Sequence, residues 1–468
     1  MNKLLYLLTF VLFISSHINA QNDSIKYEVG ITGVTSTGSD SPFWLQSRSY
    51  GAIASAPHSA NLMLGISKNL GNSTRLFDYG FKADFLFQTY DNKTNTYFHE
   101  LYVKARFLVF DLIVGSREEI LGNQDSTLSG GGLLFSQNSQ PMPKITIGME
   151  HFTAVPFTQG FVEIKGALSH GYFSEKAYEK GAFLHHKYAN IKLGGKLPVH
   201  LQYGLDHAAV WGGNIPGLGE QPVGLRDYKT IFLGHSGGTD ALAGEQINAL
   251  GNHIISQSMK LEADISEFKL SAYWQNISED GPVKKIWDTM NLPDGLWGFS
   301  IHSSKYSFIK AVLYEYLNTT DQSGPYHDKD GIIYGGADSY FENYVYHSGW
   351  TYNSRIIGTP FISGPTFNSN GELTSLNNRV QVHHFGIEGD ISSYQYRMLS
   401  SISKNYGSYR SPTAMKRNTS LLLEVNKQFP KLFNIELSCS VAGDFGALYG
   451  NSAGCQFSIR KTGNLFHY

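Results

Sequence analysis

Charged side chains are scarce in this chain. Asp, Glu, Lys and Arg make up 16% of the 468 residues, whereas soluble domains carry roughly 25%. The formal net charge at pH 7 is −2. Proteins that bind nucleic acid usually carry an excess of positive charge, so we expect no nucleic-acid partner. No linker rich in Pro, Ser or charge divides the chain, so we treat residues 21–468 as one domain.

Long apolar runs are missing as well, except at the N-terminus. Lys3 precedes an apolar stretch from Leu4 to Ile14, and the small residue Ala20 follows it. This arrangement predicts a secretory signal peptide over residues 1–20. The stretch is shorter than the ~20 residues that a membrane-spanning helix needs. Because no later run is long enough to span a bilayer, a membrane form of this chain has to be a β-barrel.

The most regular pattern lies near the C-terminus. Apolar and polar residues alternate in 433–441 and again in 455–460, which is the period of a strand with two different faces. A soluble sandwich can show this pattern with its polar face outward, and a porin-type barrel shows it with the apolar face toward lipid. For the barrel, the expected lipid-facing residues are Ile435, Leu437, Val441, Phe457 and Ile459, and the expected lumen-facing residues are Glu436, Gln456 and Arg460.

Similar alternation recurs along most of the chain, for example from Ile25 to Ile31 and from Phe81 to Phe87. Allowing about 25 residues for each strand and its loop, the residues after the signal give about eighteen strands. Together with the signal peptide and the low charge, this pattern predicts an all-β fold. The expected fold is an antiparallel transmembrane outer-membrane β-barrel of about eighteen strands.

Cysteine is rare in this chain, which has only two, Cys439 and Cys455. Both lie on the apolar face of the last predicted hairpin. They can form a disulfide if the register places them opposite each other, since the compartment is oxidising. Otherwise they are two small apolar side chains that face lipid.

The segment 213–252 interrupts the alternation. Thr239 to Leu250 is rich in Ala, Glu and Leu, which suits a helix. We therefore predict that this segment leaves the wall as a helix-containing insert and plugs the lumen. It also contains Gly234 to Gly238, which fits the G-x-S-x-G pattern of a hydrolase with Ser236 as nucleophile. That pattern needs a parallel sheet with helical crossovers, and the surrounding chain shows antiparallel alternation instead.

Metal sites are not indicated by the histidines. His185 and His186 are adjacent, as are His383 and His384, and neighbouring residues in a strand point to opposite faces. Neither pair can therefore chelate one metal ion. The sequence around Asp328 and Asp330 hints at calcium but lacks the full spacing of acidic ligands. We expect no cofactor and no metal.

A long polar and aromatic stretch runs from Tyr314 to Tyr352, with almost no aliphatic residues. Such a loop must rest on a rigid scaffold, and long loops of this kind usually carry function. Aromatic rings stack on the faces of sugars, and carboxylates and amides bind hydroxyl groups. The alternative is that the rings anchor a barrel at the membrane surface. The candidate sugar-binding residues are Tyr326, Asp328, Asp330, Asp338, Tyr340, Asn343, Tyr344, Tyr346 and Trp350.

Several stretches, in this order along the chain, resemble the capsule assembly Wzi family in its Bacteroidetes branch. They are SPFWLQSRSYG, LQYGLDHAAVWGG, ALGNH, PDGLWG, EYLNTTDQSGP, DSYFENYVYHSGWTY, GTPFIS and NNRV. Each stretch alone is a weak signal, whereas the whole set in this order is specific for the family. One departure is Glu342, where the family pattern leads us to expect Asn before Asn343.

The resemblance implies an outer-membrane barrel of about eighteen strands whose interior is partly filled. It also implies a non-catalytic role in binding or organising capsular or exopolysaccharide at the cell surface. The expected partners are this polysaccharide and outer-membrane lipid, and the expected state is a monomer. Two alternatives stay open. One is a porin or uptake channel with an open lumen, and the other is an outer-membrane hydrolase that uses Ser236.

Overall fold

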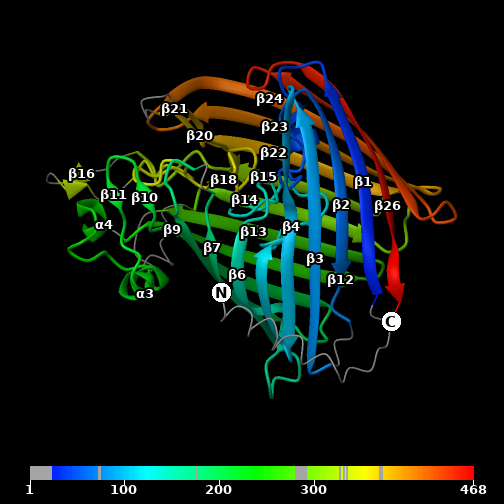
Figure 1. The fold of residues 1–468 in the computed structure, drawn as a ribbon, viewed down its shortest axis with the longest axis horizontal. Helices are drawn as coiled ribbons and strands as arrows, with labels where there is room; N and C mark the ends of the chain where they lie inside the picture. Colours follow the sequence, from blue (N-terminus) through cyan, green and yellow to red (C-terminus); the bar gives the residue numbers. More distant parts are fainter. Residues whose placement is uncertain are drawn as a thin grey trace, which may run out of the picture.

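The computed structural model describes residues 24–71, 75–174, 177–247, 249–279, 292–325, 328–329, 332–333, 336–367 and 373–467. The predicted signal peptide lies outside these residues. Within them, eighteen antiparallel strands form one sheet (Figure 1). The strands are β1 Ser24–Ser36, β2 His58–Lys68, β3 Phe77–Tyr90, β4 Lys93–Phe107, β5 Phe110–Ser116, β6 Pro143–Ala154, β7 Val162–Tyr172, β8 Phe183–Leu193, β9 Val199–Trp211, β12 Asn252–Ile265, β13 Phe268–Glu279, β14 Gly295–Ser303, β15 Ala311–Asn318, β22 Val380–Ile391, β23 Tyr394–Gly407, β24 Pro412–Phe429, β25 Ile435–Gly446 and β26 Ser452–His467.

The sheet closes on itself because the first strand pairs with the last. Ser24 lies opposite His467 and Thr35 lies opposite Cys455 in the β1–β26 ladder. A closed sheet leaves no strand edge without hydrogen-bond partners, which is what a bilayer requires of a β-protein. The predicted fold, a closed antiparallel barrel of about eighteen strands, is confirmed.

The alternation in the last hairpin separates the two faces of the wall. Val441, Phe457 and Ile459 are exposed on the outside, whereas Ser440 and Asp444 are buried on the inside. Arg460 lies 3.5 Å from Glu28 and lines an internal cavity with it. The predicted orientation of this hairpin is therefore confirmed.

The two cysteines of the hairpin do not pair. Cys439 lies opposite Phe457 and Cys455 lies opposite Val441, so the two thiols are offset along the strands. Both are free and exposed on the outer face. The register thus decides between the two possibilities that the sequence left open.

The connections differ between the two ends of the barrel. At one end lie the long segments 37–57, 117–142, 212–251 and 319–379. At the other end lie two-residue turns, such as 108–109 and 392–393. The N-terminal end of β1 and the C-terminal end of β26 lie there too. Outer-membrane barrels place long loops outside the cell and short turns in the periplasm. This pattern assigns the long loops to the extracellular end, and the 447–451 turn shares that end with loop 319–379.

Small elements lie within the long connections. The helices are α2 Phe43–Gln46, α3 Leu225–Leu233 and α4 Ala243–Ile247. The short hairpins pair β10 Asn214–Ile215 with β11 Gly219–Glu220, β16 Asp328–Lys329 with β17 Ile332–Ile333, β18 Thr351–Tyr352 with β19 Arg355–Ile356, and β20 Ser363–Phe367 with β21 Leu373–Asn377. In the residues described above, no helix has the length and apolar character to cross a membrane.

The segment that carries α3 does leave the wall, but α3 does not plug the lumen. Ile231 of α3 packs against Ala209 and Trp211 of β9, whereas their neighbours Ala208 and Val210 belong to the core inside the barrel. Neighbouring residues of a strand face opposite sides of the sheet. Helix α3 therefore lies on the outer face of the wall, at the side of the barrel in Figure 1. The lumen-plug prediction is wrong for α3, although Ile215 and Leu242 of the same segment pack with the core inside the barrel. Loss of alternation shows departure from the wall but not which face the chain then covers.

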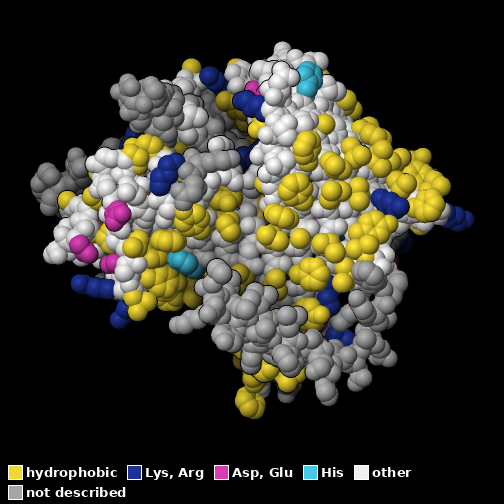
Figure 2. Space-filling model, viewed as in Figure 1, with side chains coloured by type: hydrophobic (Ala, Val, Ile, Leu, Met, Phe, Trp, Pro, Cys, Tyr) yellow, Lys and Arg dark blue, Asp and Glu magenta, His cyan; other side chains and the backbone are white. Residues whose placement is uncertain are grey.

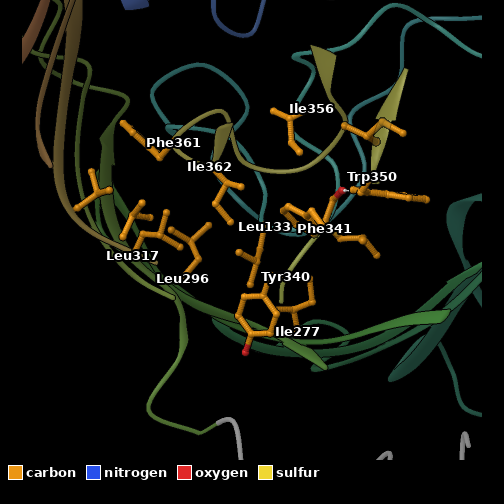
Figure 3. Close-up of a cluster of buried hydrophobic side chains, with 14 of the residues drawn as sticks. Leu133, Ile277, Leu296, Leu317, Tyr340, Phe341, Trp350, Ile356, Phe361 and Ile362 are labelled. Atoms are coloured by element: carbon orange, nitrogen blue, oxygen red, sulfur yellow. Dashed lines mark hydrogen bonds between the residues drawn. The ribbon is translucent and has the colours of Figure 1, made fainter. Parts of the chain in front are cut away.

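Loops, together with the single helical turn α2, fill the lumen instead. Their apolar residues form one core with inward residues of the wall. This core includes Phe43 and Trp44 from the first long connection, Leu128 and Leu133 from the 117–142 loop, and Tyr340, Phe341 and Trp350 from the 319–379 loop. Figure 3 shows part of it, with Ile277, Leu296 and Leu317 contributed by the wall. We call these loops the plug.

Candidate functional site

Polar side chains of the wall hold the plug by its backbone. The buried carboxylate of Glu315 accepts hydrogen bonds from Ser129 Oγ at 2.6 Å and from the Gly130 amide at 2.7 Å. Gln275 Oε1 accepts the Leu133 amide at 2.7 Å. These bonds fix the 117–142 loop at two places. The bonds to the Glu315 carboxylate are charge-assisted and so are stronger than neutral ones.

The other two plug loops are fixed in the same way. Asp444 accepts the Phe43 amide at 2.8 Å, and Glu279 accepts the Phe341 amide at 2.7 Å. Asp294 accepts the amides of Asp321 at 3.0 Å and Gln322 at 2.7 Å. Asp294 lies in the connection before β14, where burial raises its pKa to about 6 although these amide bonds act in the opposite direction.

Three of the predicted sugar-binding residues lie inside the plug. Tyr340, Tyr346 and Trp350 are buried. Trp350 donates its indole N–H to the Leu134 carbonyl at 2.9 Å, and its ring lies edge-on to Phe135 at 5.7 Å. Figure 3 shows Tyr340 and Trp350 within the interior cluster. No face of these rings is open to a ligand in this structure, so their role here is packing.

Other members of the predicted set lie nearer the surface. Tyr344 is 50% exposed. Asn343 accepts the amides of Val345 at 2.8 Å and Tyr346 at 3.1 Å through its side-chain oxygen, which holds the turn under Tyr344. Asp338 is half-buried and accepts a bond from Ser323 Oγ. Tyr326 and Asp330 lie outside the described residues, and Asp328 is described only as part of β16.

Sequence reasoning missed the neighbours of this turn. The rings of Tyr178 and His347 stack at 4.6 Å with an interplanar angle of 15°. The Tyr178 amide donates to Ser348 Oγ at 2.8 Å, so the loop after β7 is tied to the same turn. Nothing around Tyr178 in the sequence signals this, because the contact joins residues far apart in the chain. We call Asp338, Asn343, Tyr344, His347 and Tyr178 the crest.

Glu342, the residue that departs from the family pattern, has a structural role. Its carboxylate pairs with Arg410 at 2.9 Å and accepts a bond from Ser339 Oγ. Arg410 belongs to the short connection between β23 and β24. The pair therefore ties the crest loop to the β23–β24 connection at the barrel mouth.

The structure does not give Ser236 the surroundings of a hydrolase nucleophile. Helix α3 comes before it and ends at Gly234, whose φ is 62°. A nucleophile elbow needs a strand before the serine and a helix after it. Ser236 is also exposed on the outer side of the wall. Within the described part of the chain, no group of three or more His, Cys, Asp or Glu side chains could hold a metal ion.

The adjacent histidines point to opposite faces, as predicted. His186 faces the plug, with its ring 4.7 Å from Phe135, and His185 faces Phe232 on the outside at 5.4 Å. His384 is buried and bonds Ser401 Oγ at 2.7 Å, whereas His383 faces out.

A polar cavity of about 310 Å³ lies in the lumen on the periplasmic side of the plug. It is lined by Glu28, Glu424, Glu436 and Arg460 of the wall, and by Ile53 of the plug, among others. The barrel therefore combines a polar lower lumen with an apolar, packed upper lumen.

Comparison with known proteins adds the family. Residues 21–364 match the family model described as capsule assembly protein Wzi. The chain belongs to the capsule assembly protein Wzi family. Its fold is similar to the solved structure of Wzi from Escherichia coli, an outer-membrane protein involved in group 1 capsule assembly and a carbohydrate-binding β-barrel. The identity is 14%, the TM-score is 0.59, and the match covers 92% of this chain and 83% of that one.

A second solved structure has a similar fold. OccK5 (OpdH) from Pseudomonas aeruginosa matches at 7% identity with a TM-score of 0.52, covering 96% of this chain and 99% of that one. At these identities the likeness shows the fold alone. A comparison with curated proteins finds no match. Family and fold together locate this Wzi-family barrel in the cell outer membrane.

Proposed function

We propose that this Wzi-family protein binds and organises capsular or exopolysaccharide at the cell surface, without catalysis. The packed upper lumen carries the proposal. A porin or uptake channel needs an open path, and here the path at the extracellular end is occupied by an apolar core held by buried carboxylates. Moving the plug would expose that core and leave those carboxylates without their partners, which is costly.

The extracellular surface is then the place for a ligand. At the crest, Tyr344 offers an exposed ring for a sugar face, and the half-buried Asp338 offers a carboxylate for hydroxyl groups. The turn that carries Tyr344 is held by Asn343 and by the tie to Tyr178, so the ring is presented by a fixed backbone. Tyr340, Tyr346 and Trp350 contribute indirectly, by supporting this turn from below.

Affinity for one sugar unit should be weak, because a single stacked ring contributes little. A repeating polymer can engage several molecules in the membrane at once, and such multivalency raises the overall affinity without new kinds of contact. We propose that each barrel acts as a monomer surrounded by outer-membrane lipid. The competing role for Tyr344 is anchoring at the headgroup level.

The test is binding of the detergent-solubilised protein to the organism's own surface polysaccharide. Tyr344→Ala should weaken binding severalfold. Tyr306→Ala is the matched control, because Tyr306 is 54% exposed but lies in the turn at the periplasmic end. If the two variants bind equally well, the crest is not the binding surface. If the folded wild-type protein does not bind, the proposed function is wrong.

A further inference from the structure

The outer wall beneath α3 differs chemically from the rest of the barrel surface. Toward the periplasmic ends of β7, β8, β9 and β12 the outward residues are apolar and exposed, as with Ile164, Ile191, Leu201 and Leu261. Toward the extracellular ends, the same outward faces carry four histidines and a lysine. These are His170, His185, His207, His253 and Lys187, and the registers place them side by side.

Helix α3 and its flanks cover this polar patch. The His185 ring lies 5.6 Å from Tyr228 and 5.4 Å from Phe232, and His185 is fully buried. The Lys187 ammonium lies 3.8 Å from the centre of the Phe232 ring and donates to the Phe232 carbonyl. Polar and charged side chains are costly on a lipid-facing wall. The cover therefore keeps lipid away from a part of the wall that is unsuited to it.

The helix is built to stay in this position. The Asp227 carboxylate accepts a hydrogen bond from the Gly224 amide at 2.8 Å and so caps the first turn of α3. The side of α3 that faces the wall carries Tyr228, Ile231 and Phe232. Lys187 lies four residues along β8 from Phe183, which is roughly 13 Å of strand. The helix thus extends down the outside of the barrel from its rim.

The outer side of the same segment is apolar in part. Leu218, Val223, Leu225 and Leu233 are exposed, with Leu225 at 89% and Leu233 at 40%. Figure 2 shows hydrophobic side chains on the surface over this segment. Leu233 follows Phe232, which contacts Lys187, so the helix end lies alongside the upper halves of the same strands whose lower halves form the apolar belt. Because these apolar residues continue the lipid-facing belt, the partner that fits them is lipid.

We propose that α3 and the chain before it, residues 218–233, form a collar that contacts outer-leaflet lipid. In this arrangement the inner side of the collar shields the histidine patch, and its exposed leucines lie among acyl chains just below the headgroups. The collar fixes how deep this side of the barrel sits in the bilayer. This role is independent of polysaccharide binding at the crest.

The test uses single-cysteine variants that carry a polarity-sensitive fluorophore. Leu225→Cys and Leu233→Cys are made one at a time with Cys439→Ala and Cys455→Ala, and the proteins are reconstituted in phosphatidylcholine vesicles. Cys439, left alone by Cys455→Ala, is the lipid-facing reference. Ser39→Cys, in the exposed first extracellular connection, is the aqueous reference.

The collar positions should be quenched by nitroxide-labelled phosphatidylcholine as strongly as Cys439, and severalfold less than Ser39→Cys by iodide. Iodide quenching equal to that of Ser39→Cys would overturn the proposal. Protection from both quenchers that disappears at low protein-to-lipid ratio would also overturn it, because a second copy would then cover the collar. Heat-modifiable migration on gels checks that each variant is a folded barrel.

Discussion

Replacing Trp350 with Ala should unseal the barrel without unfolding it. Trp350 is 0% exposed and joins three connections. Its own loop lies against Phe135 of the 117–142 loop, and against Phe173 after β7 at 6.4 Å. Its N–H also satisfies the Leu134 carbonyl. Truncation of a buried Trp to Ala costs about 3–5 kcal/mol.

That cost falls on the plug, because Trp350 is not part of a wall strand. About 4 kcal/mol corresponds to a change of roughly 10³-fold in the population of the loosened plug. We therefore expect Trp350→Ala to show frequent current steps in planar bilayers where the wild-type protein is quiet. The barrel should still form, as judged by heat-modifiable migration on gels.

Trp297→Ala is the matched control, because Trp297 is 51% exposed on the outer face, where its ring packs against Trp274. It should behave like the wild type. If Trp350→Ala assembles fully and is as quiet as Trp297→Ala, then the packed core around Trp350 is not what seals the lumen.

Three further outcomes follow from the wall and its anchors. Val441→Arg puts a charge on the lipid-facing side of β25 and should lower the free energy of unfolding by roughly 2–4 kcal/mol if it lies near the bilayer midplane. Urea titration in vesicles measures this change, and an unchanged free energy of unfolding would argue against a lipid-facing Val441. Cys439 and Cys455 face lipid, so membrane-permeant maleimides should label them in intact vesicles, and equal labelling by impermeant maleimides would contradict that placement. Asp294 has a pKa of about 6 in the folded protein, above the ordinary value of 3.8, so the folded state binds the proton more tightly than the unfolded state. Its ionised form therefore weakens folding above pH 6, and the cost, about 3 kcal/mol at most, is relieved as the pH falls from about 6 to 4. After correction for intrinsic rates, amide exchange at Asp321 and Gln322 should be slower at pH 5 than at pH 7, and Asp294→Asn should remove the difference; the same difference in that variant would point to another group.

The wall could be predicted from the sequence because each of its strands separates two different media. Val441 and Phe457 face lipid while Ser440 and Asp444 face the interior. Apolar and polar residues therefore alternate along the strand sequences with a period of two. The same reasoning correctly placed the two histidines of each adjacent pair on opposite faces.

The plug could not be predicted in the same way. Tyr340, Tyr346 and Trp350 lie in a polar stretch and resemble surface residues, yet they are buried because the wall and the other loops supply the rest of the core. The position of α3 was missed for a related reason. An amphipathic helix needs an apolar surface to pack on, and Ala209 on the outside of β9 serves as well as Val210 on the inside.

We propose that this Wzi-family barrel retains polysaccharide at the cell surface through its extracellular crest. The most direct measurement compares cell-associated with shed polysaccharide in a strain that lacks the protein and is complemented with the wild type, Tyr344→Ala or Tyr306→Ala. All three barrels should be present at equal levels in the outer membrane. We expect that the wild type and Tyr306→Ala restore retention and that the strain with Tyr344→Ala sheds polysaccharide. Equal retention with and without the wild-type protein would contradict the claim.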